Sequence, residues 1–283
     1  MKRSVRARTP KTVIVGFGRL GGALAAGLER SRWPVKVLPR SDASVRRAVK
    51  AGHALADLEA LRSAQLCILA VPDSAVGTVA AQLEEDLGPK AALVHCAGAL
   101  DLDAFGRGAS RRARGSLHPL VAVSDPRDPL AGHSAAVAAS SAELLRTLKQ
   151  LAAALALTPL EVSDGHRAAY HAGAVMSAGL LVALLDAACA ALGTAGIGRE
   201  EAVEALVPLM RSALLGASSR GLNHGLTGPL VRGDVAVVEA HLNALPADTR
   251  GLYLRLSRRA LKLAAERLPA ETVRRFEALL GAD

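Results

Sequence analysis

Aromatic residues make up only 2% of this 283-residue sequence, so it lacks the stacking side chains on which single-stranded nucleic acids lie. It has no GxSxG motif of a serine hydrolase, and neither its histidines nor its cysteines show metal-site spacing. The formal net charge is +9, but four cations fall in the first eight residues and most of the others are scattered arginines. We therefore expect a solvated, arginine-rich surface, no metal site and no nucleic-acid partner.

Cysteine is also scarce, and the three residues Cys67, Cys96 and Cys189 all stand in apolar surroundings. An odd set of buried thiols favours reduced cysteines and a cytoplasmic protein. The basic N-terminal residues run directly into an apolar strand, which is not the pattern of a signal peptide. The longest apolar run, Ala172 to Leu185, is too short to span a bilayer, so we expect a central buried helix and no membrane partner.

The most informative segment is TVIVGFGRLGGALAAGLE, from Thr12 to Glu29, because it combines an apolar strand, a glycine turn and a helix start. Gly16, Gly18 and Gly21 fit the pattern GxGxxG. The first glycine permits the tight turn, the second lets a pyrophosphate approach the backbone, and the third allows close helix–strand packing. The segment predicts a dinucleotide site whose residues are Gly16, Phe17, Gly18, Arg19, Leu20 and Gly21.

Apolar periodicity divides the rest of the chain into two regions that follow a basic, disordered tail at residues 1–11. Strands and helices alternate over residues 12–163, which predicts a Rossmann-like, doubly wound parallel sheet. The expected strands are 12–16, 35–38, 66–71, 91–96, 115–118, 135–139 and 159–162, and the helices are 19–31, 42–51, 74–87 and 141–156. Residues 164–283 show only helical patterns and predict a smaller all-α domain for substrate binding and dimerisation.

The end of the second expected strand indicates the type of dinucleotide. An NAD-binding protein usually has an acidic residue there for the ribose hydroxyls, whereas this chain has Arg40 and Ser41. A cation and a hydroxyl suit the 2′-phosphate of NADP, although Asp42 keeps NAD open, either as ribose ligand or as helix cap. Arg19 offers a second phosphate contact. Val71, Pro72 and Asp73 end the third strand and are expected beside the nicotinamide.

Five further segments carry a resemblance to a known family. They are VPDSAV, HCAGAL, GSLHPLVAV, AYHAGAVMSAG and LTGPLVRGDVAVVEAHL. Together they resemble a mostly uncharacterised family of bacterial Rossmann-like proteins with a 6-phosphogluconate-dehydrogenase-like helical C-terminal domain. The family is related to ketopantoate, pyrroline-carboxylate and β-hydroxyacid reductases. The resemblance implies a nicotinamide-dependent oxidoreductase that dimerises through its helical domain.

The chain departs from these relatives at three positions. β-Hydroxyacid dehydrogenases carry a catalytic lysine on the first long helix after the sheet, but here no lysine lies between Lys149 and Lys262. Gly179 stands where related helices often have asparagine, and Ala97 precedes Gly98 where related strands often have serine. Another group must therefore handle the proton. The losses also favour an alternative, a catalytically silent dinucleotide sensor or scaffold.

Two histidines are candidates for that proton, because imidazole titrates near working pH. His118 lies in GSLHPL at a strand end, and the segment resembles the catalytic His–Pro segment of prephenate dehydrogenases. His171 lies early in the first long helix, next to Tyr170. Each could equally have a structural role, His118 by holding the Pro119 turn and His171 by a hydrogen bond at a domain interface.

A carboxylate site is expected farther along the chain. In LTGPLVRGD, Thr227 and Arg232 could converge on an anionic group, because arginine binds a carboxylate through two parallel hydrogen bonds. His241 follows on the next helix and is expected to face the same site. The segment could also be a helix cap with an ion pair to Asp234. The predicted reaction is NADPH-linked reduction of a small carboxylated 2-oxo or imino compound, with a prephenate-dehydrogenase-like oxidation as the alternative.

Overall fold

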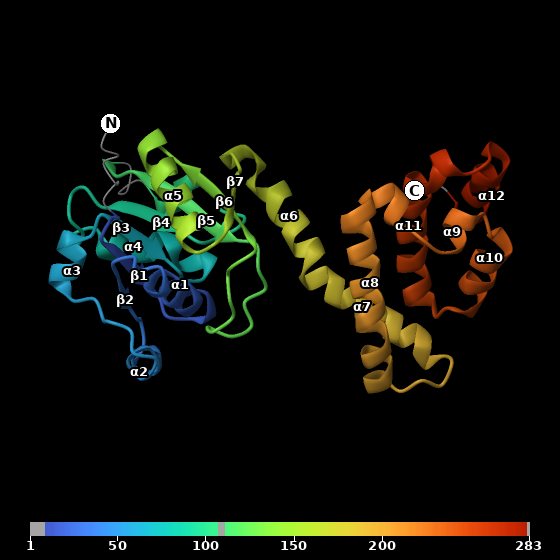
Figure 1. The fold of residues 1–283 in the computed structure, drawn as a ribbon, viewed down its shortest axis with the longest axis horizontal. Helices are drawn as coiled ribbons and strands as arrows, with labels where there is room; N and C mark the ends of the chain where they lie inside the picture. Colours follow the sequence, from blue (N-terminus) through green and yellow to red (C-terminus); the bar gives the residue numbers. More distant parts are fainter. Residues whose placement is uncertain (1–8, 107–110, 282–283) are drawn as a thin grey trace, which may run out of the picture. The chain divides into compact units, whose positions relative to one another are not determined.

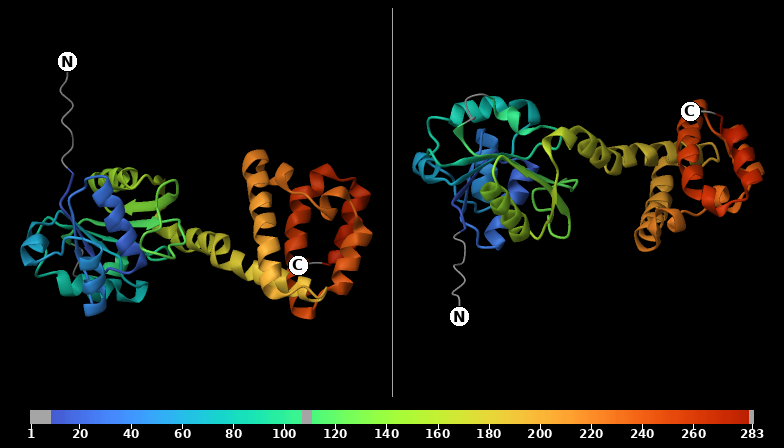
Figure 2. Two further views of the ribbon diagram at one scale, coloured as in Figure 1. Left: turned by 60° about the horizontal axis from the view of Figure 1, so that its bottom comes forward. Right: turned by 90° about the horizontal axis from the view of Figure 1, so that it is seen from above.

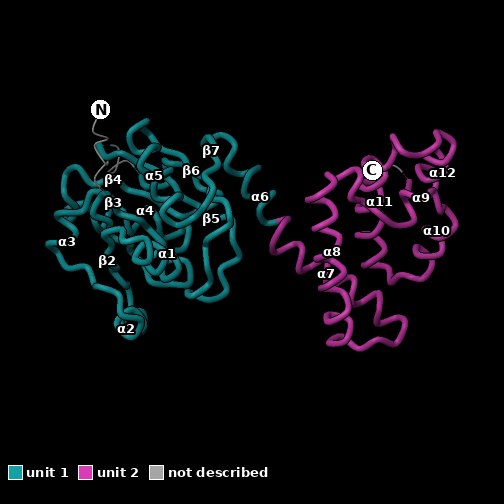
Figure 3. Tube along the Cα trace, viewed as in Figure 1, with its two compact units in different colours: residues 1–175 teal, residues 176–283 magenta. Residues whose placement is uncertain are grey.

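A computed structural model describes residues 9–106 and 111–281, and it divides into two compact units at Val175 and Met176 (Figure 1, Figure 3). The first unit contains a β-sheet and the second is helical. The predicted order of an α/β region followed by an all-α region is therefore confirmed. The predicted basic tail falls largely on Met1–Arg8, which lie outside the described residues.

The sheet of the first unit has seven strands in the order β2-β1-β3-β4-β5-β6-β7. Their bounds are β1 Thr12–Val15, β2 Val35–Leu38, β3 Leu66–Leu69, β4 Ala92–His95, β5 Arg114–Pro119, β6 Ser134–Ala139 and β7 Thr158–Glu161. All neighbouring pairs are parallel except β5 and β6, which run antiparallel. The predicted doubly wound parallel sheet is thus confirmed, with one antiparallel pair among the described strands. A loop without a crossover helix joins the two strands, and such a connection produces an antiparallel pair.

Helices cover both faces of this sheet, as the right-hand view of Figure 2 shows. The helices that begin in this unit are α1 Arg19–Arg30, α2 Asp42–Lys50, α3 Leu58–Ser63, α4 Val76–Leu83, α5 Ala142–Ala154 and α6 Arg167–Ser177, with short 3-10 turns η1 Asp73–Ala75, η2 Leu102–Phe105 and η4 Asp164–His166. Ile14 packs with Leu24 and Leu148 on one face, whereas Val13 and Val15 pack on the other. Because β1 to β5 run parallel, their carboxyl ends lie along one edge of the sheet.

The second unit consists of helices around a smaller core. They are α7 Gly179–Gly193, α8 Arg199–Gly225, α9 Pro229–Arg232, α10 Val235–Ala244, α11 Ala247–Ala264 and α12 Ala270–Leu280, with the 3-10 turn η5 Ala265–Arg267. Val238, Leu242, Leu261, Phe276 and Leu280 form its buried cluster. The backbone of α8 leaves helical geometry at Gly221 (φ 78°), so α8 consists of two helical stretches.

The apolar run from Ala172 to Leu185 is not buried within the chain, so the expectation of a central buried helix was wrong here. Met176, Leu180 and Val182 are 65%, 54% and 66% exposed. The helical segment Asp164–Gly193 would cross a membrane by length and composition alone, and its most apolar 18-residue window has a mean hydropathy of 2.1. Only 6% of its most apolar window is buried.

Candidate functional site

The glycine turn between β1 and α1 has the three local geometries that a pyrophosphate site requires. Gly16 adopts φ +98°, and a Cβ built there would meet the Ala70 carbonyl oxygen at 2.4 Å. A Cβ on Gly21 would lie 2.2 Å from the Gly16 carbonyl oxygen, so the helix packs directly on the turn. Around Gly18, by contrast, no atom lies within 4 Å of the Cβ position. The chain thus leaves open space only where the phosphates would approach the backbone.

The start of α1 also suits an anion. Gly18 is its N-cap residue, no side chain caps the helix, and its first turn contains no acidic residue. The first N–H groups of the helix are therefore available to phosphate oxygens, and the helix dipole favours negative charge there. Phe17 does not face this space, because its ring is buried in the core. Arg47, which the sequence did not single out, donates from Nη2 to the Phe17 carbonyl oxygen at 3.3 Å and supports the turn.

The two residues predicted to bind the adenosine phosphate are both exposed at the end of β2. Arg40 donates to Gln82 Oε1 at 3.2 Å, an exposed contact that a stronger anionic acceptor could replace. Ser41 is the N-cap of α2, and its side chain forms a capping box with Ser44. Asp42, considered above as a helix cap, is instead the first residue of α2. Ser41 thus has a local structural role, whereas Arg40 is the side chain most available for a phosphate.

A pocket of about 370 Å³ extends from the glycine turn along the carboxyl edge of the sheet. That volume lies within the range of small-molecule sites, roughly 300–1,000 Å³. All of its lining residues belong to the first unit: Gly18, Arg19, Leu20, Ala70, Val71, Pro72, Asp73, Cys96, Ala97, Gly98, His118, Pro119, Val121, Val123 and His171. It therefore brings predicted cofactor residues from the turn and β3 together with both predicted catalytic histidines.

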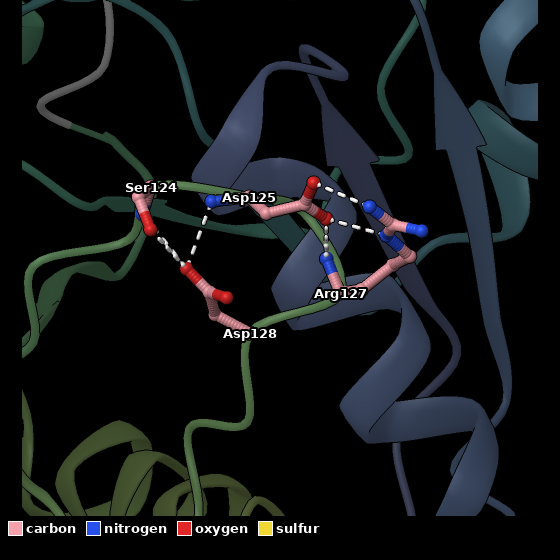
Figure 4. A network of polar contacts seen from close by, with 4 residues as sticks. All are labelled: Ser124, Asp125, Arg127 and Asp128. Atoms are coloured by element: carbon pink, nitrogen blue, oxygen red, sulfur yellow. Dashed lines mark hydrogen bonds and ion pairs between the residues drawn. The ribbon is translucent and has the colours of Figure 1, made fainter.

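One wall of the pocket comes from the loop between β5 and β6, which includes Val121 and Val123. Figure 4 shows how that loop is braced. The Asp128 carboxylate accepts hydrogen bonds at 2.8 Å from the Ser124 amide, the Ser124 hydroxyl and the Asp125 amide. Arg127 donates to Asp125 through its amide, Nε and Nη2. The Arg127 hydrogen bonds lower the pKa of Asp125 to about 2, so this brace stays ionised at neutral pH.

Also on the pocket lining, His118 lies close to Tyr170, His171 and Gly98. Its Nδ1 is 2.7 Å from the Tyr170 hydroxyl, and its ring centroid is 5.7 Å from that of His171. A Cβ on Gly98 would come within 2.3 Å of His171 Cδ2 and 3.0 Å of His118 Nε2. Gly98 is therefore required for the two histidines to approach this strand end. Nδ1 is held by Tyr170 and Nε2 is the nitrogen toward Gly98.

The environment keeps His118 neutral at physiological pH. Burial, with smaller electrostatic contributions from His171, Arg167 and His95, lowers the pKa of His118 to about 4. A neutral imidazole carries a proton on one ring nitrogen and a lone pair on the other. Because the Tyr170 hydroxyl both donates and accepts, it can support either tautomer. His118 can thus donate a hydrogen bond to a carbonyl or accept a proton from a hydroxyl.

Behind His118 lies a second buried histidine. His95, which the sequence did not single out, ends β4 and is fully buried. Burial lowers its pKa to about 4, with a smaller contribution from Arg167. Its register partner on β5 is Ser116, which shares a face of that strand with His118. His95 and Ser116 therefore form a buried polar layer next to His118, and no local sequence pattern predicted this layer.

Three predicted substrate residues lie in the second unit. Thr227 is exposed just before α9. Arg232 Nε lies 2.8 Å from Asp234 Oδ2, with the arginine side chain 63% exposed, so the ion pair weighed as an alternative is present. His241 Nδ1 is 2.9 Å from the Tyr253 hydroxyl on α11. None of the three belongs to the residues that line the pocket of the first unit.

Comparison with known proteins agrees with this architecture. A Rossmann-like domain family matches residues 2–119, and the domain of unknown function DUF2520 matches residues 134–260. No functionally curated protein shows significant similarity to the chain. Among solved structures, the Bacteroides fragilis protein BF3122, whose name proposes an NADP oxidoreductase, is 25% identical. The match has a TM-score of 0.71 and covers 89% of this chain and 98% of that one.

Two further structures show the fold at lower identity. Protein TM1727 from Thermotoga maritima is 24% identical with a TM-score of 0.73, covering 91% of this chain and 100% of that one. A pyrroline-5-carboxylate reductase from Coxiella burnetii is 16% identical with a TM-score of 0.63, covering 93% and 100%. The predicted similarity to such reductases is thus confirmed at the level of the fold. The chain combines a Rossmann-like domain with a C-terminal DUF2520 domain.

Proposed function

We propose that the protein is an NAD(P)-dependent oxidoreductase that reduces a small carboxylated 2-oxo or imino compound with NADPH. The observation that carries the proposal is the single pocket that joins the glycine turn to His118 and His171. Hydride chemistry needs a dinucleotide site next to a group that manages a proton, and this pocket offers both. The names of the similar structures, an NADP oxidoreductase and a pyrroline-5-carboxylate reductase, support the same class of reaction.

In this proposal each part of the chain has a defined task. Gly16, Gly18 and Gly21 hold the pyrophosphate against the start of α1. The bound nicotinamide supplies or accepts the hydride. His118 faces the reacting oxygen or nitrogen through Nε2 and stabilises the charge that develops there, while Tyr170 fixes its ring by the hydrogen bond at Nδ1. His171 narrows the same end of the pocket.

The preference for NADP over NAD rests on Arg40. Its guanidinium is exposed and bound only to the neutral side chain of Gln82 among the described residues, so a 2′-phosphate would be a stronger acceptor. Replacement Arg40→Ala should lower the affinity for NADPH by about tenfold and leave the affinity for NADH almost unchanged. Equal losses for both dinucleotides in a calorimetric titration would contradict this preference.

One observation favours the reverse direction as a second candidate. His118 is neutral at pH 7, and a neutral imidazole accepts the proton of a substrate hydroxyl more readily than it delivers one. A prephenate-dehydrogenase-like oxidation of a carboxylated alcohol would use this state directly. Oxidation with NADP+ that rises as pH increases through the His118 pKa would support this direction.

We also propose that the protein is a homodimer built through its helical region. An apolar groove on the second unit is lined by α7 and α8. Val182 and Leu214 in this groove are 66% and 57% exposed in the single chain. Contiguous apolar surface of this kind is rare on monomers and typical of oligomer interfaces.

The decisive experiment starts with Gly18. Gly18→Val places a Cβ in the open space of the turn, so the variant should fold normally, but its side chain should block the pyrophosphate and weaken NADPH binding by more than about tenfold. Titrations with NADPH and NADH, followed by turnover with 2-oxo acids and cyclic imines, test the rest. Wild-type protein that binds neither dinucleotide would refute the proposal. Binding without turnover of any compound would favour a silent sensor.

A further inference from the structure

Arg167, in the first turn of α6, is a buried cation without a partner. Its side chain is 1% exposed, and Nε, Nη1 and Nη2 all lack a hydrogen-bond acceptor among the described residues. By contrast, Arg112 in the same unit has hydrogen-bond acceptors for its guanidinium group. It forms an ion pair with Glu84 and donates to the carbonyl oxygens of Gly88, Glu84 and Leu87. Since an unpaired buried charge is strongly unfavourable, Arg167 requires a counter-ion from outside the chain.

The position of Arg167 ties it to the pocket. Tyr170 and His171 follow it by three and four residues, so all three side chains lie on one face of α6. His171 lines the pocket and Tyr170 is hydrogen-bonded to His118. Arg167 also acts electrostatically on both His118 and His95. The unpaired guanidinium therefore belongs to the polar layer behind the pocket.

The other unpartnered atoms of this layer show which ligand it would accept. They are His95 Nδ1 and Ser116 Oγ. His95 Nε2 is 3.1 Å from the Asp101 carbonyl oxygen, and because a carbonyl only accepts, Nε2 carries the proton and Nδ1 is an acceptor. Arg167 only donates, and Ser116 can donate one proton. Donors around a fixed positive charge thus outnumber the single obligatory acceptor, which suits an oxyanion.

The chain does not supply this oxyanion itself. Asp164 and Asp101 are the carboxylates that act on Arg167 electrostatically, yet both are exposed and neither forms an ion pair with it among the described residues. The Asp101 carboxylate instead accepts from the Asp103 amide at 3.0 Å. Arg167 does not line the pocket itself, but His171, one turn along the same face of α6, does, so a small ligand in the pocket would approach the guanidinium from that side.

We propose that Arg167 binds the carboxylate of the substrate, through two parallel hydrogen bonds, beside the histidine that handles the proton. This inference rests on the function proposed above and deepens it, because it moves the carboxylate site from Arg232 to the first unit. Arg232 is exposed and already paired with Asp234. Since Tyr170 contacts His118 and shares a helix face with Arg167, the carboxylate lies only a few bonds from the reacting carbon. The substrate is thus a short 2-oxo, 2-imino or 2-hydroxy acid.

The same arrangement couples binding to proton transfer. In the free protein the Arg167 charge contributes to holding His118 neutral. A bound carboxylate offsets that charge and raises the His118 pKa toward neutrality. Only a carboxylated substrate would therefore prepare His118 as a proton donor, which gives the site a basis for selecting its substrate.

Oxamate, an unreactive analogue of a 2-oxo acid, is a direct probe. We expect it to bind the wild-type protein in calorimetry, about 10- to 100-fold more weakly to Arg167→Met, and unchanged to the control Arg274→Met, which alters an exposed arginine of α12. NMR titration should show that oxamate raises the His118 pKa in the wild type but not in Arg167→Met. The variant alone should already show a higher His118 pKa than the wild type. Should Arg167→Met fail to fold, Arg167→Lys keeps the charge but loses the planar fork, and it should still weaken oxamate about tenfold.

The outcomes separate this inference from the proposed function. Oxamate binding that depends on Arg167 without any NADPH binding would leave the carboxylate site standing and refute the oxidoreductase. If the protein turns over NADPH but both Arg167 variants bind oxamate as tightly as the wild type does, the oxidoreductase function stands and the carboxylate site at Arg167 is refuted. Absence of oxamate binding to the wild type, or its loss in Arg232→Met instead, would overturn the assignment to Arg167.

Discussion

The two units of this chain bury their side chains in opposite ways. The first unit covers both faces of its sheet and, within that dense core, keeps polar groups such as His95, Ser116 and Arg167 out of water. The second unit has one small buried cluster and leaves large apolar side chains such as Val182 and Leu214 exposed. A buried polar group is unfavourable unless it has a hydrogen-bond or charge partner, whereas a large exposed apolar face marks a surface for protein association.

This difference assigns separate tasks to the two units. In the first unit the unsatisfied groups are polar and are mostly donors around one positive charge, which calls for a small polar ligand. In the second unit the unsatisfied surface is hydrocarbon, which calls for another protein surface. We infer that chemistry resides in the first unit and association in the second. Three substitutions or conditions test the contrast, beginning with the largest expected effect.

Association should fail when charge enters the apolar groove. The double variant Val182→Glu/Leu214→Glu should convert a dimer wholly to monomer, because each buried unpaired carboxylate costs about 3–5 kcal/mol. Light scattering coupled to size exclusion measures the mass. The matched control is Leu58→Glu on α3 of the first unit, an equally large apolar residue that is 44% exposed and should leave the mass unchanged. A monomeric wild-type protein would contradict the assignment of association to the second unit.

Added methyl groups should act with opposite sign in the two units. Gly21→Ala would force a Cβ to 2.2 Å from the Gly16 carbonyl oxygen, so unfolding free energy should fall by about 3 kcal/mol. Gly251→Ala lies inside α11 with no atom within 4 Å, and it should raise stability by up to about 1 kcal/mol. Urea titration measures both. Equal effects would show that the helical unit is packed as tightly as the sheet.

Acid should destabilise the first unit before the second. The pKa of His95 falls from 6.5 to about 4 on burial, so between these values the unfolded chain binds a proton that the folded chain excludes. Stability is complete above pH 6.5 and decreases as pH falls, by about 2 kcal/mol between pH 7 and pH 5 for this one group. His95→Gln should flatten the pH profile of thermal unfolding, whereas the exposed His224→Gln of α8 serves as control. An unchanged profile in His95→Gln would argue against a neutral buried imidazole.

Much of the fold followed from local patterns. The β-branched run at Val13–Val15 and the three glycines of the turn determine their own geometry, so the strand, turn and helix were predicted correctly. The direction of β6 was not, because a short, uniformly apolar segment such as Ala135–Ala139 gives the same sequence pattern in a parallel and an antiparallel pair. The six-residue helix α3 was missed since it is too short to show a periodic apolar face.

The candidate site was recovered in part for the same reason. His118 and His171 stood out as titratable residues near expected strand and helix ends, and the pocket contains both. Arg167 did not, because its burial arises from the tertiary fold, which brings it near His95 and His118, residues far away in sequence. Its spacing from Tyr170 and His171 was nevertheless a usable signal. Ser41 was interpreted as a phosphate ligand, although Ser44, three residues later, indicated the capping box that the structure shows.

The antiparallel insertion of β6 has a consequence for how this protein can diversify. A parallel strand in its place would need a crossover helix, whereas here β5 and β6 are joined at the pocket edge by a self-braced loop that carries Val121 and Val123. Loops tolerate insertion and substitution better than sheet strands do. The polar layer therefore lies in the fixed sheet, whereas the β5–β6 loop can change without disturbing it. Substitutions in this loop are the simplest way for evolution or protein engineering to alter which substrate the pocket accepts.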